Sequence, residues 1–240
     1  SIELTPQVRA ALDIEETSLT PQELMHRILL APVDLFYNGG IGTYLKASTE
    51  SHAQVKDRAN DNIRVDGNAM RARIVAEGGN LGATQAGRIE FALKGGRIFT
   101  DAIDNSAGVD CSDHEVNAKI WLDTEVNAGK LSEADRNKLL LDMTNDIEDL
   151  VLRDNTLQTH LLVREWQAQS DANVVDGYAA LITALEKEGA VNRELEQLPS
   201  DTVLAGRKEN GIGLTTPELA VVVANVKNRY KRLLSALPLV

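Results

Sequence analysis

Cysteine is almost absent from this sequence, because Cys111 is the one thiol in 240 residues. A single thiol can form neither an internal disulfide nor, by itself, a zinc site, which fits a reducing compartment. Long apolar runs are absent as well. No stretch approaches the roughly 18 to 20 residues of a membrane span, and residues 1–12 lack the charged-then-apolar pattern of a leader. We therefore expect a cytoplasmic protein with no membrane partner.

Basic residues are in deficit, with 25 Lys and Arg against 36 Asp and Glu. The formal net charge of −11 leaves no broad positive field to attract a phosphate backbone, so nucleic acid is not an expected partner. An initiator methionine is also missing, because the chain opens with Ser1. We expect the chain to be a piece of a longer polypeptide.

Metal-ligand patterns are missing too. No His, Cys or carboxylate pair has ligand-like spacing with a complementary pair elsewhere, so no metal site is expected. Asp113 and Glu115 flank His114, but three adjacent residues on a helix point in different directions. They do not make a catalytic constellation. The other histidines are scattered along the chain at His26, His52 and His160.

What the sequence does contain is an alternation of short apolar runs and amphipathic segments. Residues 20–31 begin with an N-cap threonine followed by proline and, three residues past the cap, glutamate, which predicts a helix. Residues 33–37, 71–76 and 97–100 read as strands, and residues 84–94 read as a helix. This order predicts an α/β fold with a partial, Rossmann-like sheet of parallel strands and flanking helices.

From about Ser112 onward the pattern is helical only. Apolar residues recur at three- and four-residue spacing in 132–155, 171–187 and 215–237, so we expect an all-helical C-terminal region. The predicted division places the C-terminal half of a nucleotide-binding domain in residues 1–128 and a helical domain in residues 129–240.

Three loops rich in glycine and side-chain amides follow the predicted strands and should gather at one edge of the sheet. These loops are Asn38-Gly39-Gly40-Ile41-Gly42, Glu77-Gly78-Gly79-Asn80 and Asn105-Ser106-Ala107-Gly108. Each permits two interpretations. The glycines allow backbone amides to approach a cofactor closely, but ordinary tight turns, including one with a left-handed asparagine, need the same residues.

Ser112 also permits two interpretations. Small polar residues precede it directly before the predicted helix, where amide hydrogens and a partial positive charge favour a bound carboxylate or phosphate. Alternatively, Ser112 simply caps that helix, with Glu115 completing a capping box.

The longer strings FYNGGIGTYLKASTESHAQVKDRANDNIRV and AEGGNLGATQAGRIEFALKGGRIFTDAIDNSAGVDCSDHEVN resemble the large NAD-dependent glutamate dehydrogenases of bacteria. The resemblance runs over most of residues 1–128, and residues 198–221 are similar to the family's C-terminal helical region. The EGAN motif of glutamate dehydrogenases is echoed by Glu77-Gly78-Gly79-Asn80, with one substitution. Their NAGGV motif is echoed by Asn105-Ser106-Ala107-Gly108-Val109, with two.

The resemblance implies a cofactor, NAD, and a reaction, the oxidation of L-glutamate to 2-oxoglutarate and ammonia. It implies cofactor contacts from the three loops and contact of Ser112 with the side-chain carboxylate of glutamate; the cofactor residues are Asn38, Gly39, Gly40, Gly78, Gly79, Asn80 and Asn105. The glycine fingerprint and the catalytic residues would lie upstream, so the isolated chain is expected to be inactive. A homo-oligomer is also expected. The alternative hypothesis is a non-catalytic α/β and helical module for interaction or regulation.

Overall fold

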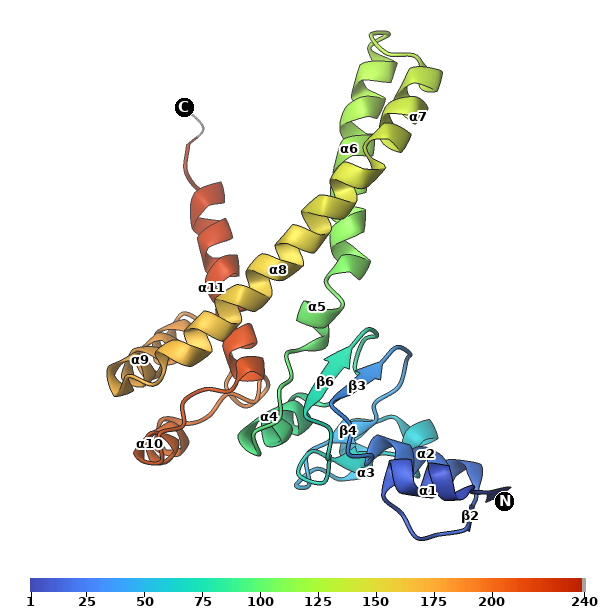
Figure 1. The fold of residues 1–240 in the computed structure, drawn as a ribbon. Coiled ribbons are helices and arrows are strands. Elements are labelled where there is room, and N and C mark those ends of the chain that lie inside the picture. The colour runs from blue at the N-terminus through green and yellow to red at the C-terminus, as the bar shows by residue number, and fades with distance from the viewer. Residues whose placement is uncertain (239–240) are drawn as a thin grey trace. The chain divides into compact units, whose positions relative to one another are not determined.

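The computed structural model describes residues 1–238, which form two compact units (Figure 1). One unit holds residues 1–101 together with the chain from Leu162 onward, and the other holds residues 102–161. The fold is mixed α/β, with small parallel sheets and a large share of helix. The two units do not divide at residue 128, and the domain boundary predicted there stays a prediction. No helix within residues 1–238 combines the length and apolar character that a membrane crossing requires.

The chain begins with an antiparallel strand pair and two helices. Their bounds are β1 (Ile2–Glu3), α1 (Pro6–Leu12), β2 (Ser18–Leu19) and α2 (Pro21–Leu29). β1 pairs with β2, which the sequence did not predict. α2 begins where predicted: the Thr20 hydroxyl accepts the Glu23 N–H at 3.3 Å, and the Glu23 carboxylate accepts the Thr20 N–H at 2.8 Å. This capping box satisfies two donors at the helix start.

Two predicted strands form the parallel pair that organises the first unit. β3 (Leu35–Asn38) lies beside β6 (Ile74–Glu77), with Asn38 level with Glu77. The predicted third strand at 97–100 is reduced to a single parallel bridge between Arg97 and Ile74, because the chain enters a helix at Asp101. The Arg97 carbonyl accepts the Val75 N–H, so β6 lies between β3 and this bridge.

The segment between β3 and β6 contains a second parallel pair that the sequence did not predict. Its elements are β4 (Leu45–Lys46), α3 (His52–Val55), the 3-10 turn η1 (Arg58–Asn60) and β5 (Val65–Asp66). β4 pairs with β5. After β6, the Thr84 hydroxyl caps α4 (Gln85–Leu93), close to the predicted helix. Apolar side chains from these elements make the core: Leu29, Leu45, Val65, Met70, Ala72, Val75, Ala83, Phe91 and Ile98.

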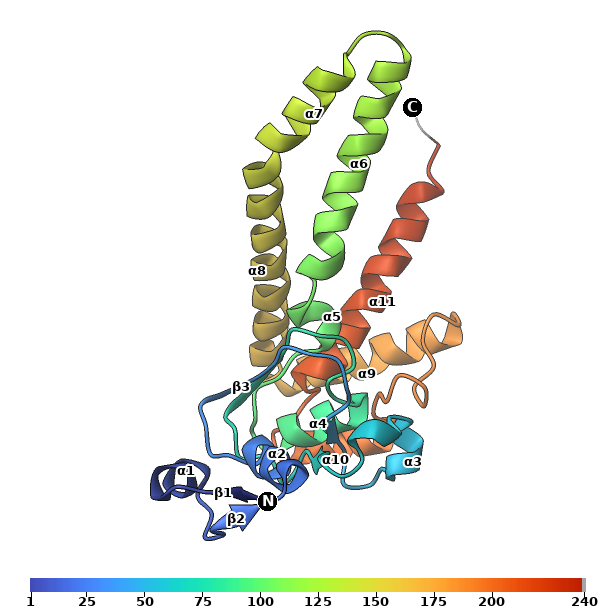
Figure 2. The same ribbon diagram turned by 90° about the vertical axis from the view of Figure 1, so that its right-hand side faces the viewer.

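The second unit is helical and begins earlier than predicted. Its helices are α5 (Asp101–Asp104), which straddles the division at residue 101, α6 (Ala107–Asn127), α7 (Glu133–Asp142) and the first part of α8 (Thr144–Ala168). Figure 2 shows α7 turning back from the end of α6 and continuing into α8. The single helix predicted from Ser132 to Asn155 is two helices, because the chain breaks at Met143. There the Thr144 hydroxyl donates to the Leu141 carbonyl, in competition with the helical ladder.

Three further helices complete the first unit, and two of them were predicted. They are α9 (Ala172–Lys187), α10 (Asp201–Glu209) and α11 (Thr216–Ser235). The Thr216 hydroxyl donates to the Ile98 carbonyl at 2.7 Å, and the Gln85 amide donates to the Pro217 carbonyl at 3.1 Å. The start of α11 is therefore bonded directly to α4 and to the segment that follows it.

Candidate functional site

Two of the three predicted loops lie together beyond the carboxyl ends of parallel strands. The first loop begins at Asn38, the last residue of β3, and residues 78–82 follow β6. The Gly78 N–H donates to the Asn38 carbonyl at 2.9 Å. Parallel strands bring such loops to the same edge, where α/β sheets bind ligands. For these two loops the predicted common edge is confirmed.

Gly79 is needed because the two loops touch there. A Cβ atom built on Gly79 would lie 2.4 Å from the carbonyl oxygen of Gly40, and one built on Gly78 would lie 2.0 Å from the Tyr37 hydroxyl. Neither glycine has a positive φ. At Gly79 the facing backbone excludes a side chain, whereas the contact at Gly78 is with the end of the exposed Tyr37 side chain, which can move. The left-handed residue of the turn is Leu81, with φ of 58°, and not Asn80.

A buried ion pair stands at the base of the second loop. Glu77 is 1% exposed, and its two carboxylate oxygens accept from Nε and Nη2 of Arg88 at 2.7 and 2.8 Å. The Glu77 carboxylate also accepts the Ala83 N–H at 3.0 Å, which joins both ends of the loop. Asp101 lies 3.3 Å from Arg88 and accepts the Leu81 N–H at 2.8 Å. Charged hydrogen bonds thus hold the backbone of residues 78–83 in place.

Sequence reasoning missed Arg88 and Asp101 as parts of this site. Arg88 is the one charged residue on the buried side of α4, alongside Ile89 and Phe91. An arginine on an otherwise apolar face needs a buried partner, and Glu77 ends the neighbouring strand. These two signals together could have identified the pair.

The first loop is held by a separate set of hydrogen bonds. The Asp57 carboxylate accepts the Thr43 N–H at 2.8 Å and the Asn60 amide at 2.7 Å. The hydrogen bond from Asn60 has the larger effect and the one from Thr43 the smaller, and together they hold the pKa of Asp57 below its usual value. Arg64 donates to the Thr43 carbonyl at 2.7 Å, and the Thr43 hydroxyl donates to the Leu81 carbonyl at 2.7 Å. Thr43 therefore connects the two loops.

The predicted residues of these loops differ in accessibility. Gly39, Gly40 and Asn80 are exposed, and Gly78 and Gly79 are partly buried. Asn38 is buried, and its side-chain oxygen accepts the Gly40 N–H at 3.5 Å, a long contact. A ligand at this edge would meet the backbone of the first loop and the side chain of the second.

Asn105 and Ser112 belong to the second unit, and a common edge for the third loop stays a prediction. Ser112 is exposed within α6, five residues after the helix begins, so the expectation that Ser112 caps this helix is wrong. The N-cap position is Ser106, and Glu115 forms an ion pair with Lys119 instead of a capping box. The Ser106 side chain makes no cap hydrogen bond, but Asp110 lies in the first turn, where an acidic side chain is favourable.

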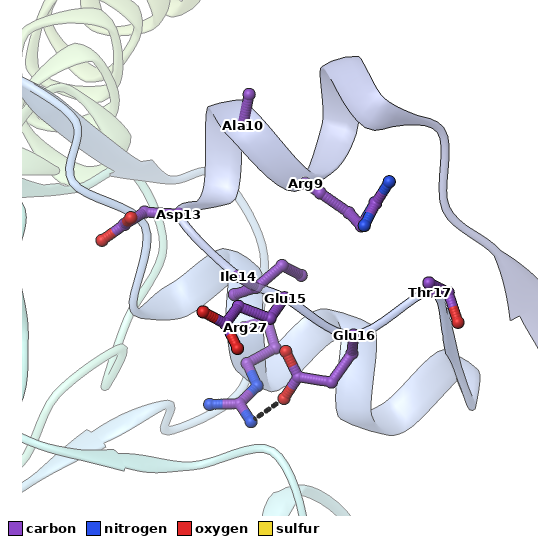
Figure 3. Close-up of a pocket in the computed structure, with 8 residues that line it drawn as sticks. All are labelled: Arg9, Ala10, Asp13, Ile14, Glu15, Glu16, Thr17 and Arg27. Carbon is purple, nitrogen blue, oxygen red and sulfur yellow. Dashed lines mark hydrogen bonds and ion pairs between the residues drawn. The ribbon is translucent and has the colours of Figure 1, made fainter.

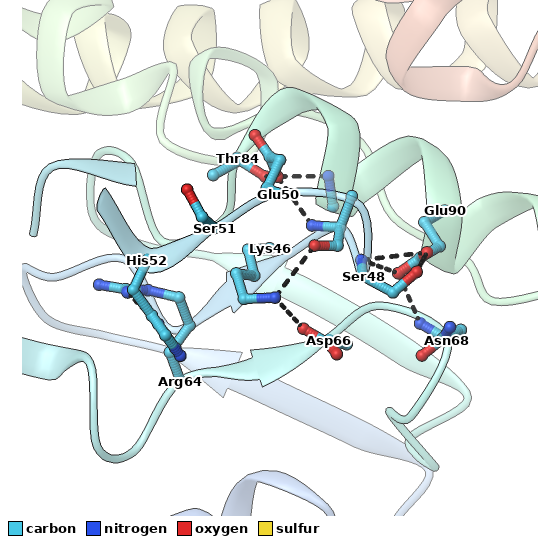
Figure 4. Close-up of polar contacts among 12 residues, drawn as sticks. Lys46, Ser48, Glu50, Ser51, His52, Arg64, Asp66, Asn68, Thr84 and Glu90 are labelled. Carbon is cyan, nitrogen blue, oxygen red and sulfur yellow. Dashed lines mark hydrogen bonds and ion pairs between the residues drawn. The ribbon is translucent and has the colours of Figure 1, made fainter. Parts of the chain in front are cut away.

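A second polar cluster lies where β4 and β5 end (Figure 4). Buried Lys46 forms an ion pair with Asp66, and Glu90 accepts hydrogen bonds from the N–H groups of Ser48 and Asn68. These groups bind one another and join β4 and β5 to α4. A broad depression beside α1 and α2 has charged walls, with Arg27 paired to Glu16 (Figure 3). No predicted site residue lines it.

Comparison with known protein families identifies the family to which this chain belongs. A family model described as bacterial NAD-glutamate dehydrogenase, catalytic domain, matches residues 1–165. The chain belongs to the bacterial NAD-glutamate dehydrogenase family. The predicted membership of this family is thereby confirmed.

Curated members of this family match nearly the whole chain. The NAD-specific glutamate dehydrogenase of Mycobacterium tuberculosis is 52% identical over 233 residues, which are 95% of this chain. Those of Pseudomonas aeruginosa and Halomonas elongata are 51% and 48% identical over 95% and 96% of the chain. The chain spans 14% of the length of each of these relatives.

Proposed function

We propose that this chain is the part of an NAD-dependent glutamate dehydrogenase that binds the nicotinamide end of the cofactor and the side-chain carboxylate of glutamate. The whole enzyme would oxidise L-glutamate to 2-oxoglutarate and ammonia. The observation that supports this proposal most strongly is the meeting of two glycine loops at the carboxyl ends of β3 and β6 in a chain of this family. We interpret the parallel strands as part of a Rossmann-like sheet.

The exposed surface of the two loops suits a flat, partly polar cofactor. A Cβ atom built on Gly40 would have nothing within 4 Å, so the backbone is open there. The side chains of Ile41 and Leu81, 90% and 66% exposed, offer apolar surface beside the Asn80 amide. In this proposal Asn80 and the backbone of Gly39 and Gly40 hold the cofactor. Bound NAD would supply the hydride acceptor, while the chain orients it.

Glutamate would be held from the second unit. Ser112 would donate its hydroxyl proton to the distal carboxylate of the substrate, and Asn105 would contribute to the cofactor side. The acid and base groups of the reaction would come from the rest of the polypeptide, so the isolated chain should not produce NADH from glutamate. The whole enzyme would be a cytoplasmic homo-oligomer.

Substitution of Ser112 by alanine in the full-length enzyme tests the substrate role. Loss of a hydrogen bond to a charged group costs about 1.5 to 3 kcal/mol, so the KM for glutamate should rise roughly 10- to 150-fold while the KM for NAD changes little. Cys111→Ala is the matched control, because Cys111 is the exposed neighbour on the same helix. An unchanged KM for glutamate in Ser112→Ala would contradict the assignment.

A further inference from the structure

A second group of chemically active side chains lies between two helices of the second unit. Asp110 and His114 are one turn apart on α6, and Asp154 lies on α8. The Nε2 atom of His114 is 3.6 Å from Oδ1 of Asp110 and 3.5 Å from Oδ2 of Asp154. One imidazole nitrogen and one oxygen from each carboxylate all lie within 4.8 Å of one another. Both helices contribute, so the cluster joins segments 40 residues apart in sequence.

Two atoms of this cluster are closed to solvent and lack a hydrogen bond. Among the described residues, neither Nε2 of His114 nor Oδ2 of Asp110 has a hydrogen-bond partner. The contacts of 3.5 and 3.6 Å are too long for hydrogen bonds between nitrogen and oxygen. Buried polar atoms are usually satisfied, so the unsatisfied Nε2 of His114, which lies near one oxygen of each aspartate, calls for a partner.

We propose that Asp110, His114 and Asp154 bind a divalent transition-metal cation such as Zn²⁺. Ligand atoms held 2.0 to 2.2 Å from a zinc ion at tetrahedral angles lie roughly 3.3 to 3.6 Å from one another. The contacts of His114 Nε2 with the two carboxylate oxygens, 3.6 and 3.5 Å, fall in this range. The cluster was not expected from the sequence, because Asp154 is distant along the chain and comes close only when α8 folds beside α6.

The donor set determines the class of cation. An imidazole nitrogen with two carboxylate oxygens suits Zn²⁺, Mn²⁺ or Co²⁺, whereas Mg²⁺ and Ca²⁺ prefer oxygen ligands alone. Two carboxylates and a neutral imidazole would neutralise the charge of a divalent ion. Arg153 lies 3.7 Å from Oδ1 of Asp154. The other carboxylate oxygen, Oδ2, is the one that faces His114. Three protein ligands leave at least one coordination position open to water or another ligand.

None of the three ligands is a proposed glutamate dehydrogenase residue, and exposed Ser112 lies between Asp110 and His114 along α6. No cofactor or substrate contact is assigned to any of the three ligands. The test of the metal site and the test of the proposed function can therefore fail independently. A bound cation would cross-link α6 to α8 and stabilise the second unit against unfolding, because it binds the folded arrangement alone.

The test is direct metal binding to the 240-residue chain after removal of metal with EDTA. Calorimetric titration with Zn²⁺ and the visible absorption of added Co²⁺ should both show one ion per chain, and Zn²⁺ should raise the melting temperature. His114→Ala and Asp154→Asn should each weaken Zn²⁺ binding by at least about 100-fold, since each removes a direct ligand. His160→Ala, on the exposed side of α8, is the matched control and should bind as the unaltered chain does.

Three results would overturn the proposal. They are the absence of one-to-one binding, equal weakening in His160→Ala, and unchanged affinity in His114→Ala. Asp154→Asn is nearly isosteric and preserves the helix, so it remains informative if His114→Ala does not fold. Circular dichroism of each variant without metal separates loss of a ligand from loss of structure.

Discussion

Replacement of Arg88 by methionine should destabilise the first unit by about 3 to 5 kcal/mol. The arginine side chain is 6% exposed and its partner Glu77 is 1% exposed, so solvent cannot replace the lost guanidinium. Methionine fills a similar volume, which limits any cavity effect. The cost arises because the Glu77 carboxylate would remain buried without its counter-charge.

The matched control is Arg73→Met. Arg73 also forms an ion pair, at 2.9 Å from Asp34, but the two side chains are 80% and 84% exposed. Surface pairs of this kind contribute about 0 to 1 kcal/mol, so this variant should be close to the unaltered chain. The double variant Glu77→Gln with Arg88→Met removes both charges and should be more stable than Arg88→Met alone.

Urea denaturation followed by circular dichroism measures the free energies of unfolding. Hydrogen exchange of the peptide that covers residues 78–88 measures local opening, because the Ala83 N–H donates to Glu77 and the Leu81 N–H donates to Asp101. Arg88→Met should accelerate exchange there. A loss below about 1 kcal/mol, equal to that of Arg73→Met and without faster exchange, would refute the view that this ion pair holds the loop.

Two further predictions concern the same loops, and a third concerns helix α9. Gly79→Ala places a Cβ atom 2.4 Å from a carbonyl oxygen of the facing loop and should cost about 1 to 3 kcal/mol. Gly177→Ala, which meets nothing within 4 Å inside α9, should stabilise the chain by about 0.5 to 1 kcal/mol in the same denaturation assay. Asp57 has a folded-state pKa lowered by hydrogen bonds from Asn60 and Thr43, below the reference value of 3.8. Its contribution to stability is present above that reference pKa and is lost as pH falls through the folded-state pKa. Asp57→Asn should therefore flatten the acid limb of melting temperature against pH, and an unchanged limb would exclude this role.

Local patterns predicted several elements because their causes are local. The capping box of Thr20 and Glu23 starts α2, and the same arrangement at Thr215 and Glu218 starts α11. Apolar runs that end in glycine loops correctly indicated β3 and β6 as parallel strands. The identity of long motif strings indicated the family, which needs only the order of residues.

Other features depended on partners far away in sequence. The third strand was shortened to one bridge, and β4 pairs with β5 although neither has more than two residues. Strands this short have no periodicity to read, because their pairing is set by long-range contacts. The small polar residues before Ser112 predict a loop, whereas α6 begins at Ala107.

The sequence by itself determined the capped start of α2, the two glycine loops behind parallel strands and the family. Tertiary structure alone decided why Gly79 must lack a side chain, that Glu77 and Arg88 hold its loop, and that Asp154 joins Asp110 and His114. The physical reason is the range of the forces involved. Caps and turns are satisfied within a few residues, whereas steric contact, a buried counter-charge and a ligand set require segments that only the folded chain brings together.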